Sequence, residues 1–465
     1  MSGATLISHG CRLNIAESEK IAAMLSAEDD LVVVNSCAVT AEAVKTARQA
    51  IRRAKRERPE ARIVVTGCAA ETEPETFRAM SEVSNIVPNS RKLDLSLYPS
   101  SQRKQGYRET KAAFSPPGIP ASAGTTGYFA GAPRPGHART FLPVQNGCDH
   151  RCTFCIIPYG RGPSRSLPAG GVIEEIKVAV DQGAKEIVLT GVDLTAYGAD
   201  LPGQPSLGSL VARILRYVPE LPRLRLSSLD PCEMDETLLE LIAHEKRLMP
   251  HVHLSLQAGD DMILKRMKRR HSRAQAVDLA AKLKALRPEI AIGADLIAGF
   301  PTEDEAMFAN TLALIDDCGI ALAHIFPYSP RAGTPAARMP QVARGVVKER
   351  AARLRDAAAH AKAAWLKEQI GQVTDVLVEL DGTSGHAANF ARVAIAPLPL
   401  RERGWEEGTR ESAPNSLAKS AIEADLANPS PRPTPARGEG AFAPNMIVRT
   451  RIVGVEGDSL IGVAA

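Results

Sequence analysis

The sequence predicts an α/β protein made of a small parallel α/β domain, a central partial (β/α) barrel and a small C-terminal β-barrel. Three observations support this fold class. β-Branched runs alternate with helical stretches in residues 1–95, a longer strand–helix series occupies residues 139–370, and short strands dominate residues 371–465. Strands that alternate with helices, as in the first two segments, are typical of parallel sheets. A set of short strands, as in the third segment, is typical of a small barrel.

Composition indicates a folded, multidomain protein. The chain has 465 residues, of which 44% are hydrophobic and 24% charged, and its formal net charge is +4. No apolar run approaches the roughly 20 residues that span a bilayer, and the N-terminal segment lacks the features of a secretory signal. We therefore expect a cytoplasmic protein with no membrane partner. In that compartment the eight cysteines are expected to bind metal or take part in catalysis rather than form disulfides.

Three β-branched runs in the N-terminal domain (1–95) predict parallel strands. They are TLISHG (5–10), LVVVNS (31–36) and RIVVTG (62–67), with helical stretches near 15–27 and 41–58. A cysteine follows each run at once: Cys11, Cys37 and Cys68. Because parallel strands bring their carboxyl ends to one edge, we expect the three thiols to meet there. Taken singly, each could instead be a small buried hydrophobic residue.

A Pro- and Gly-rich linker (96–138) leads into the central domain (139–370). Six strand candidates separated by amphipathic helical segments predict a partial or complete barrel with its active site at the carboxyl ends of the strands. These candidates are 140–145, 186–191, 223–228, 251–256, 291–297 and 320–326. A helix-rich tail at 345–370 completes the domain.

Short strand candidates in the C-terminal domain (371–465) predict a small β-barrel. They are 373–380, 390–395, 446–453 and 459–463. Residues 396–444 interrupt them, are rich in Pro, Arg, Glu and Gly, and have no periodicity. We expect these residues to form a disordered insertion.

The strongest chemical signal is GCDHRCTFC, in which Cys148, Cys152 and Cys155 follow the spacing C-x3-C-x2-C directly after a strand. Zinc sites use C-x2-C pairs and a closed set of four ligands, and no nearby cysteine completes such a set. His150 lies inside the loop, but zinc ligation by it is the less favoured interpretation. Three thiolates suit a cubane iron–sulfur cluster whose fourth iron has no protein ligand. Chemistry can occur at that open iron.

This loop resembles the signature of the radical S-adenosylmethionine (SAM) superfamily. The resemblance implies a [4Fe–4S] cluster whose open iron binds the amino and carboxylate groups of SAM and whose electron cleaves the sulfonium to give a 5′-deoxyadenosyl radical. Phe154, just before the third cysteine, matches an aromatic position that packs near the adenine of SAM. The alternative is ordinary packing at the strand end, because a buried aromatic ring needs no ligand.

Other candidates for binding SAM lie at strand ends of the central domain, where barrel enzymes bind their ligands. Gly191 would allow the methionine group to approach the backbone closely. Ser228, Gln257 and Asp295 would hydrogen-bond ribose or carboxylate, and Asp193 is a weaker candidate. A purely local structural role is the alternative for each of them.

The chain outside 396–444 resembles the methylthiotransferase family, which joins an N-terminal three-cysteine domain, a radical loop and a C-terminal barrel. The resemblance is carried by GCRLNIAES (10–18), VVNSCAVTAEA (33–43), TGCAA (66–70), CDHRCTFCIIPYGRGPSRS (148–166), LTGVDLTAYG (189–198), RLSSLDP (225–231), HLSLQAGDD (253–261), LIAGFP (296–301) and HIFPYSPRAGTPAA (324–337). It implies that Cys11, Cys37 and Cys68 hold a second, auxiliary [4Fe–4S] cluster that carries or delivers sulfur.

The segment GCRLN, with Arg12 after the first cysteine, resembles the branch that acts on N6-threonylcarbamoyladenosine beside the tRNA anticodon. The isopentenyladenosine branch usually has GCQMN there, and the ribosomal-protein branch has GCPKN. The resemblance implies a monomeric enzyme that also needs an electron donor, such as flavodoxin or ferredoxin, and a sulfur source. Two alternatives stay open: a ribosomal-protein methylthiotransferase, and a non-catalytic RNA-binding protein whose cysteines form structural metal sites.

Basic segments are compatible with an RNA substrate. Lys and Arg residues gather in the stretch 41–58 and in KRMKRRHSR (265–273), although a solvated helix face without a ligand is an equal alternative for each. The C-terminal barrel resembles a TRAM module, a small barrel with basic loops that bind RNA. That resemblance makes Arg392, Arg449 and Arg451 candidate RNA contacts.

Overall fold

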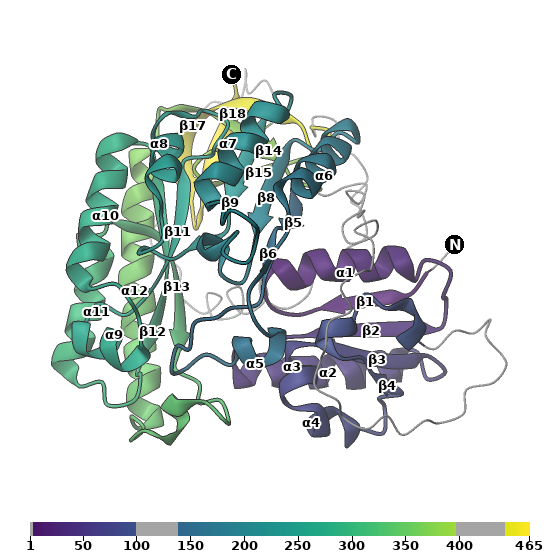
Figure 1. The fold of residues 1–465 in the computed structure, drawn as a ribbon. Helices are drawn as coiled ribbons and strands as arrows, with labels where there is room; N and C mark the ends of the chain where they lie inside the picture. The colour runs from purple at the N-terminus through teal and green to yellow at the C-terminus, as the bar shows by residue number, and fades with distance from the viewer. Residues whose placement is uncertain (1–2, 99–137, 397–441) are drawn as a thin grey trace, which may run out of the picture.

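The computed structural model describes residues 3–98, 138–396 and 442–465. The linker predicted at 96–138 and the insertion predicted at 396–444 lie almost wholly outside the described residues. The described chain forms an N-terminal parallel α/β sheet, central parallel sheets covered by helices, and a C-terminal closed barrel, which confirms the predicted fold class (Figure 1). Within it, no helix has both the length and the apolar character needed to cross a membrane.

The N-terminal domain is a four-stranded parallel sheet in the order β1-β2-β3-β4. Its strands are β1 (Thr5–Ser8), β2 (Leu31–Ser36), β3 (Arg62–Gly67) and β4 (Asn85–Ile86). Its helices are α1 (Arg12–Met24), α2 (Ala41–Glu57), α3 (Cys68–Thr72) and α4 (Pro74–Arg78). α1 begins directly after Cys11, earlier than the predicted stretch 15–27, because Leu13 and Asn14 in its first turn are already buried.

The continuous apolar pattern of β2 arises because every one of its residues is buried. Val32 packs with Ile51 of α2 on one face of the sheet, whereas Val33 packs with Ile21 of α1 on the other. β1 and β3 pair with β2 in parallel. Helices therefore cover both faces, and the carboxyl ends of the three strands come to a common edge.

The strands of the central domain are parallel and form two adjoining sheets, β5-β8-β9 and β10-β11-β12-β13. Their bounds are β5 (Thr140–Pro143), β8 (Glu186–Thr190), β9 (Arg223–Leu226), β10 (Ser228–Leu229), β11 (His251–Gln257), β12 (Ala291–Ala298) and β13 (Ile320–Pro327). All six predicted positions hold strands. The strand predicted at 223–228 is divided at Ser227 into β9 and β10, which belong to different sheets. The amide of Ser227 donates to the carbonyl of Leu189 at 3.0 Å.

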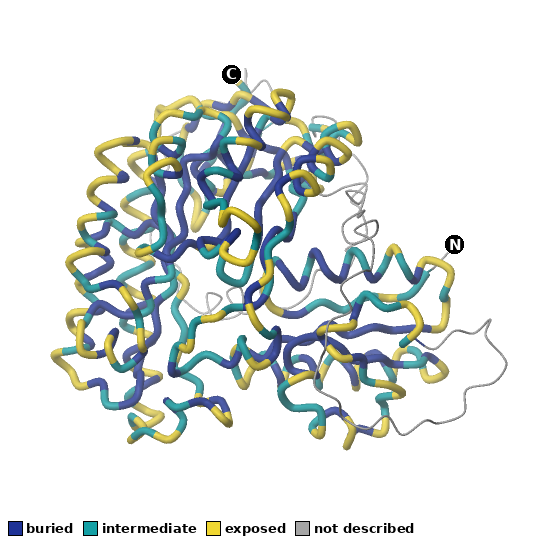
Figure 2. Tube along the Cα trace, in the orientation of Figure 1, coloured by how far each residue is buried: buried dark blue, intermediate teal, exposed yellow. Residues whose placement is uncertain are grey.

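Helices cover the outer faces of these sheets, while the strands between them are buried (Figure 2). They are α6 (Ala169–Asp181), α7 (Leu207–Tyr217), α8 (Glu236–His244), α9 (Asp261–Met267), α10 (Arg273–Leu286), α11 (Glu305–Asp317) and α12 (Arg344–Glu368). The loop with the second cysteine set is flanked by α5 (Ile157–Arg161) and by the antiparallel pair β6 (Gln145–Asn146) and β7 (Arg165–Ser166). Short 3₁₀ helices occupy Asn89–Arg91, Leu95–Leu97, Leu194–Ala196 and Pro335–Arg338.

The C-terminal domain is a closed barrel in the order β14-β15-β16-β18-β17. Its strands are β14 (Val373–Val378), β15 (Ser384–Ala387), β16 (Arg392–Ala396), β17 (Ile447–Glu456) and β18 (Ser459–Ala464). It caps the amino ends of the central strands: Arg223 donates to the carbonyl of Asp375 at 2.7 Å, and Arg225 donates to that of Ala388 at 3.2 Å. The hairpin that joins β15 and β16 therefore covers this end of the central domain.

A buried ion pair lies at this closed end. Arg225 donates to both carboxylate oxygens of Glu186, at 2.9 and 3.2 Å, and both side chains are almost fully buried. Burial alone would raise the pKa of Glu186, but Arg225 and the neighbouring arginines outweigh it and lower this pKa to about 2. The carboxylate thus stays charged and tied to β9 throughout the neutral range.

This pair predicts an acid-dependent loss of stability. Because the pKa of Glu186 is lower in the folded chain than its ordinary value of 4.5, its contribution is complete above that pH and is lost as the pH falls toward 2. The shift corresponds to about 3 kcal/mol. We expect the free energy of unfolding in urea to fall more steeply over this range for the wild type than for Glu186→Gln. Parallel pH profiles of the two proteins would contradict the prediction.

Candidate active site and its two cysteine sets

β1, β2 and β3 run in parallel and end at a common carboxyl edge (Figure 1). The first cysteine set lies at this edge, because Cys11, Cys37 and Cys68 come at or just after the ends of these strands. A Cβ placed on Gly10, next to Cys11, would lie 2.8 Å from the sulfur of Cys37. Burial raises the pKa of Cys37 to about 12, and electrostatic interaction with Cys11 and, more weakly, with Cys68 adds to the rise. The three thiols are thus mutual neighbours, as the strand order predicts.

Three cysteines directly follow a glycine with positive φ, and both cysteine sets contain at least one of them. These glycines are Gly10 (φ 98°), Gly67 (φ 93°) and Gly147 (φ 75°). Residues with a Cβ rarely adopt this conformation. At Gly67 a Cβ would also lie 2.5 Å from the side-chain oxygen of Asn35 and 2.6 Å from the amide nitrogen of Ser36, both on the neighbouring strand.

Substituting Gly67 therefore tests the geometry of the first set alone. Gly67→Ala is expected to cost about 2–4 kcal/mol of stability, from the strained φ together with the collision. We expect the reconstituted variant to bind about half of the wild-type iron while the electronic spectrum of the second set persists. Gly170→Ala is the control, since a Cβ there meets nothing within 4 Å. Full iron content in Gly67→Ala would contradict the prediction, since it would show that the first set keeps its geometry in spite of the added Cβ.

The second cysteine set, Cys148, Cys152 and Cys155, lies in the loop between β6 and α5. Backbone hydrogen bonds fix this loop: Cys148 donates to Gly162 at 3.1 Å, and Thr153 donates to Met267 at 3.0 Å. Burial raises the pKa of Cys155 to about 12, with a further contribution from Cys152. The loop therefore holds three thiols in a partly buried position.

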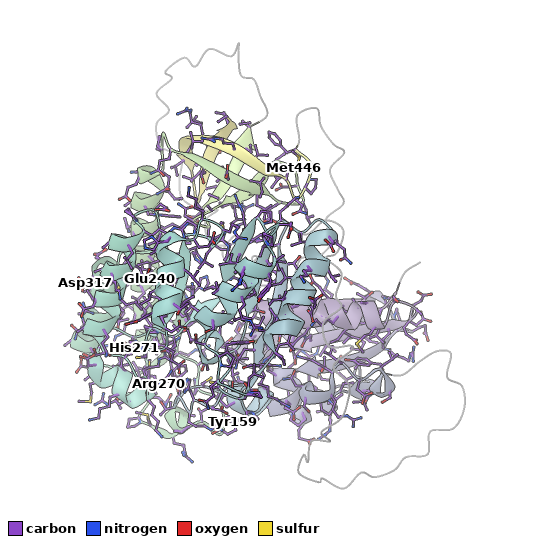
Figure 3. The ribbon with its side chains drawn as sticks, turned by 45° about the horizontal axis from the view of Figure 1, so that its top comes forward. Tyr159, Glu240, Arg270, His271, Asp317 and Met446 are labelled. Carbon is purple, nitrogen blue, oxygen red and sulfur yellow. The ribbon has the colours of Figure 1, made fainter. Side chains whose placement is uncertain are left out.

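The two cysteine sets are neighbours. α3, which begins at Cys68, packs against α5, and a Cβ on Gly160 of α5 would lie 3.3 Å from the Cβ of Cys68. The thiol of Cys155 also interacts electrostatically with Cys68. Tyr159 of α5 is 57% exposed and lies at the junction of the central and N-terminal domains (Figure 3). A substrate bound at this junction would have access to both sets.

A buried network joins the two domains beside the cysteines. Arg161 donates to both carboxylate oxygens of Glu17 at 2.9 and 3.0 Å, and to the side-chain oxygens of Asn14 at 2.5 Å and Asn146 at 2.9 Å. Lys92 also contacts Glu17. Burial would raise the pKa of Glu17, but Lys92 and Arg161 outweigh it and lower this pKa to about 2. Glu17 is therefore the ionised centre of a link between α1 and the loop of the second set.

Charged side chains also surround the second set. A guanidinium nitrogen of Arg269 lies 3.8 Å from the sulfur of Cys152, and its other terminal nitrogen donates to Asp230 at 2.9 Å and to the carbonyl of Ser255 at 2.7 Å. On the other side, the carboxylate of Asp193 lies 3.5 Å from the sulfur of Cys148. These contacts hold the loop against the carboxyl ends of the central strands.

Three arginines of the basic segment 265–273 are paired with acidic side chains and so are not free to bind phosphate. Arg269 is buried against Asp230, Arg270 pairs with Glu233 at 2.6 Å, and Arg273 pairs with Asp317. These arginines neutralise acidic groups of the protein itself. His150 lies 2.9 Å from Asp193, and hydrogen bonding to Asp193 and Glu233 raises the pKa of His150 to about 10. The ligand atoms of His150, Asp193 and Glu233 lie within 4.8 Å of one another, an arrangement that could hold a metal ion.

Two of the candidate SAM-binding residues have their own partners. Phe154 packs edge to face on Phe300, with centroids 6.5 Å apart, within a small apolar cluster. At Gly191 a Cβ would lie 2.9 Å from the side-chain oxygen of Gln145. Gln145 therefore explains the need for glycine at 191 without a ligand. SAM binding by both residues remains a prediction.

The other three candidates lie at different depths of the central barrel. Ser228 is exposed on β10, and Gln257 ends β11 with an unusual φ of 70°, a conformation that often marks functional positions. Asp295 lies within β12, where one carboxylate oxygen is 2.9 Å from His253 and 3.2 Å from His324. These imidazoles occupy one oxygen of Asp295, so a ribose contact there remains a prediction with less support.

The basic residues considered for RNA lie on outer surfaces. Arg392 on β16 and Arg449 and Arg451 on β17 are exposed. Their side chains have no hydrogen bond or ion pair within the described chain. On α2, Val44, Ala47, Ile51 and Ala54 are buried, so its cations face outward. Two of those cations are neutralised locally, by the pairs Lys45–Glu42 at 3.1 Å and Arg53–Glu57 at 2.8 Å. RNA binding by these surfaces remains a prediction.

The chemistry of the donors fits an iron–sulfur cluster at each set. Each set offers three thiols, and three thiolates leave one iron of a [4Fe–4S] cluster open. The two remaining cysteines lie elsewhere in the described structure: Cys318 is buried in the central core, and Cys232 lies beside Asp230. Burial raises the pKa of Cys37 and Cys155, so a bound metal is what would hold these sulfurs as thiolates at neutral pH.

A three-thiol loop at the carboxyl edge of a parallel partial barrel defines the class of the protein, a radical SAM enzyme. Residues 142–315 match the model of the radical SAM superfamily, and residues 4–88 match that of an uncharacterized protein family, UPF0004. The first match contains the second cysteine set, and the second match contains the first set.

Three curated relatives identify the family within that class. The chain is 48% identical to the threonylcarbamoyladenosine tRNA methylthiotransferase MtaB of Rickettsia prowazekii, over 84% of this chain and 90% of that protein. It is 34% identical to the tRNA-2-methylthio-N(6)-dimethylallyladenosine synthase of Erythrobacter litoralis, over 90% and 96%. It is 35% identical to MtaB of Chlamydia pneumoniae, over 79% and 82%. The chain belongs to the radical SAM methylthiotransferase family, as its sequence motifs indicate.

Proposed function

We propose that this protein transfers a methylthio group to the adenine ring of N6-threonylcarbamoyladenosine next to the tRNA anticodon. The observation that carries the proposal is the adjacency of two three-thiol sets across the contact of α3 and α5. A reaction that both activates a C–H bond and inserts sulfur needs two such sites side by side. The 48% identity to MtaB of Rickettsia prowazekii supports the threonylcarbamoyl substrate over the dimethylallyl one, since the identity to the dimethylallyladenosine synthase of Erythrobacter litoralis is 34%.

Each set has a separate role in the proposal. Cys148, Cys152 and Cys155 hold the cluster that binds SAM, and Cys11, Cys37 and Cys68 hold the auxiliary cluster. When bound, these groups supply a radical that removes a hydrogen atom from the adenine ring, and the sulfur and methyl group that replace it. The protein itself holds the two sets close together through the bonds of Arg161 to Glu17. The hairpin between β15 and β16 closes the far end of the central domain. Such enclosure protects reactive species from water.

The RNA lies at the open side of the junction in this proposal. The target base enters near the exposed Tyr159, whose ring is suited to stack on a base. Arg392, Arg449 and Arg451 contact phosphates elsewhere on the tRNA. The protein acts as a cytoplasmic monomer, takes electrons from a small donor such as flavodoxin or ferredoxin, and obtains sulfur from a separate source.

Mass spectrometry of tRNA nucleosides from cells that lack this gene tests the proposal. We expect the 2-methylthio form of threonylcarbamoyladenosine to disappear while threonylcarbamoyladenosine itself remains. Complementation with the wild-type gene should restore the product. Unchanged tRNA together with loss of a methylthio group from a ribosomal protein would instead assign the protein to the ribosomal-protein branch.

Anaerobic reconstitution separates the enzyme from a metal-stabilised RNA-binding protein. We expect about eight iron and eight sulfide atoms per chain, as two [4Fe–4S] clusters require, together with formation of 5′-deoxyadenosine from SAM. Zinc content without SAM cleavage would contradict the proposed enzyme.

A further inference from the structure

Arg12 lies where all three domains of the described chain meet. It is the first residue of α1 and directly follows Cys11. Its guanidinium carbon lies 6.0 Å from the ring centroid of Phe141 on β5 and 5.5 Å from that of Phe390, in the hairpin of the C-terminal barrel. The side chain therefore reaches from the first cysteine set toward the closed end of the central barrel.

Aromatic rings, rather than an anion, hold this guanidinium. Within the described residues, the side chain of Arg12 has no hydrogen bond or ion pair. The half-buried guanidinium of Arg12 therefore keeps N–H groups that are free to donate to a ligand.

The neighbouring charges are already matched. Arg139 pairs with Glu379 at 2.7 Å, and Arg225 pairs with Glu186 at 2.9 Å. Asp295 attracts Arg12 electrostatically, but its carboxylate is held between His253 and His324. Among the described residues, these acidic groups are thus bonded to other side chains, and none of them accepts a hydrogen bond from the guanidinium of Arg12.

We propose that the guanidinium of Arg12 binds the carboxylate of the threonylcarbamoyl group on the substrate adenosine. This inference rests on the proposed function, since only that substrate carries a carboxylate on its base. The position favours the modified base over the RNA backbone, because Arg12 is next to a cysteine of the first set and points inside the barrel. The rings of Phe141 and Phe390 fix the guanidinium and leave its N–H groups to form two parallel hydrogen bonds with a carboxylate. Arg12 is therefore a specificity-determining residue.

The test compares two RNAs that differ only at this carboxylate. One is an anticodon stem–loop that carries N6-threonylcarbamoyladenosine, and the other is the same RNA with the carboxylate converted to its methyl ester. Dissociation constants are measured anaerobically by fluorescence anisotropy with reconstituted full-length protein. The proteins are the wild type, Arg12→Gln, Arg12→Lys and the control Arg216→Gln. Arg216 is an exposed arginine that lies 5.6 Å over Tyr217 and so also contacts an aromatic ring, but on the outer surface.

We expect the wild type to bind the acid roughly 10- to 100-fold more tightly than the ester, the range for a charge-assisted hydrogen-bonded pair. Arg12→Gln should reduce this ratio to about 1, Arg12→Lys should retain part of it, and Arg216→Gln should leave it unchanged. The wild-type ratio alone tests the carboxylate contact even where a variant folds poorly.

Three outcomes would overturn the inference. Equal weakening of both RNAs by Arg12→Gln would assign Arg12 to a backbone phosphate or to packing. Weakened binding of SAM, with an unchanged ratio for the RNAs, would assign it to the methionine carboxylate. A wild-type ratio of the two dissociation constants near 1 would show that no cation of the protein binds the carboxylate. Failure of the proposed function is distinguishable, because the wild type would then not methylthiolate the acid RNA at all.

Discussion

Replacing Cys155 with alanine is expected to reduce the formation of 5′-deoxyadenosine at least about a thousand-fold, because two thiolates do not hold a cubane cluster with one open iron. The iron content of the reconstituted protein should fall from about eight to about four atoms per chain. Replacing Cys37 should remove a similar amount of iron. In that variant the methylthiolated nucleoside should disappear while SAM cleavage falls far less, because the two sets lie on separate domains.

Cys318→Ala is the matched control for these variants. Cys318 is also buried, but it packs in the central core away from both sets. It should therefore cost roughly 1–2 kcal/mol of stability from lost packing without loss of iron. Equal loss of SAM cleavage in Cys37→Ala and Cys155→Ala would contradict the division of roles between the two sets.

Arg161→Met is expected to lower the free energy of unfolding by about 3 kcal/mol, because it removes one partner of a buried ion pair. Arg161 also forms the hydrogen bonds that tie α1 to the loop of the second set. A double-mutant cycle with Glu17→Gln measures the coupling of the pair, which we expect to be at least about 1 kcal/mol. Methylthiolation should decrease more than SAM cleavage, since the variant loosens the contact between the domains.

Arg53→Met provides the comparison for this prediction. Arg53 and Glu57 form an ion pair at 2.8 Å, but both side chains are 60% exposed. Its loss should leave the free energy of unfolding almost unchanged, because solvent screens an exposed ion pair. An additive cycle for Arg161 and Glu17 would show that Arg161 acts through packing and not through its charge.

Local pattern was sufficient to predict the strands and the meeting of the thiols. β2 could be predicted because it is buried on both faces and so carries an unbroken apolar run. The position of a cysteine directly after each of three parallel strands then placed Cys11, Cys37 and Cys68 at one edge. By contrast, the division of the strand 223–228 at Ser227 has no local signal, because Ser227 bonds to the neighbouring strand β8.

The roles of charged and polar residues could not be predicted in this way. Arg161 and Arg269 look like other basic residues in the sequence, yet one pairs with Glu17, 144 residues earlier, and the other lies against Cys152. Gln145 has no local signal either, although it crowds Gly191 and accepts a hydrogen bond from the amide of Asp193 at 2.9 Å. The sequence shows that a side chain is positively charged, but it shows neither whether that side chain is buried nor which acidic group it contacts.

The sequence alone determined the fold class, the two sets of three cysteines and the family, because these depend on periodicity and on spacing along the chain. Tertiary structure decided that the two sets are neighbours and that Arg161 joins them. It also decided that Arg12 lies beside two aromatic rings, with no ion pair in the described part of the chain. The physical reason is that burial and charge pairing depend on residues far apart in the chain, which only the packed domains bring into contact.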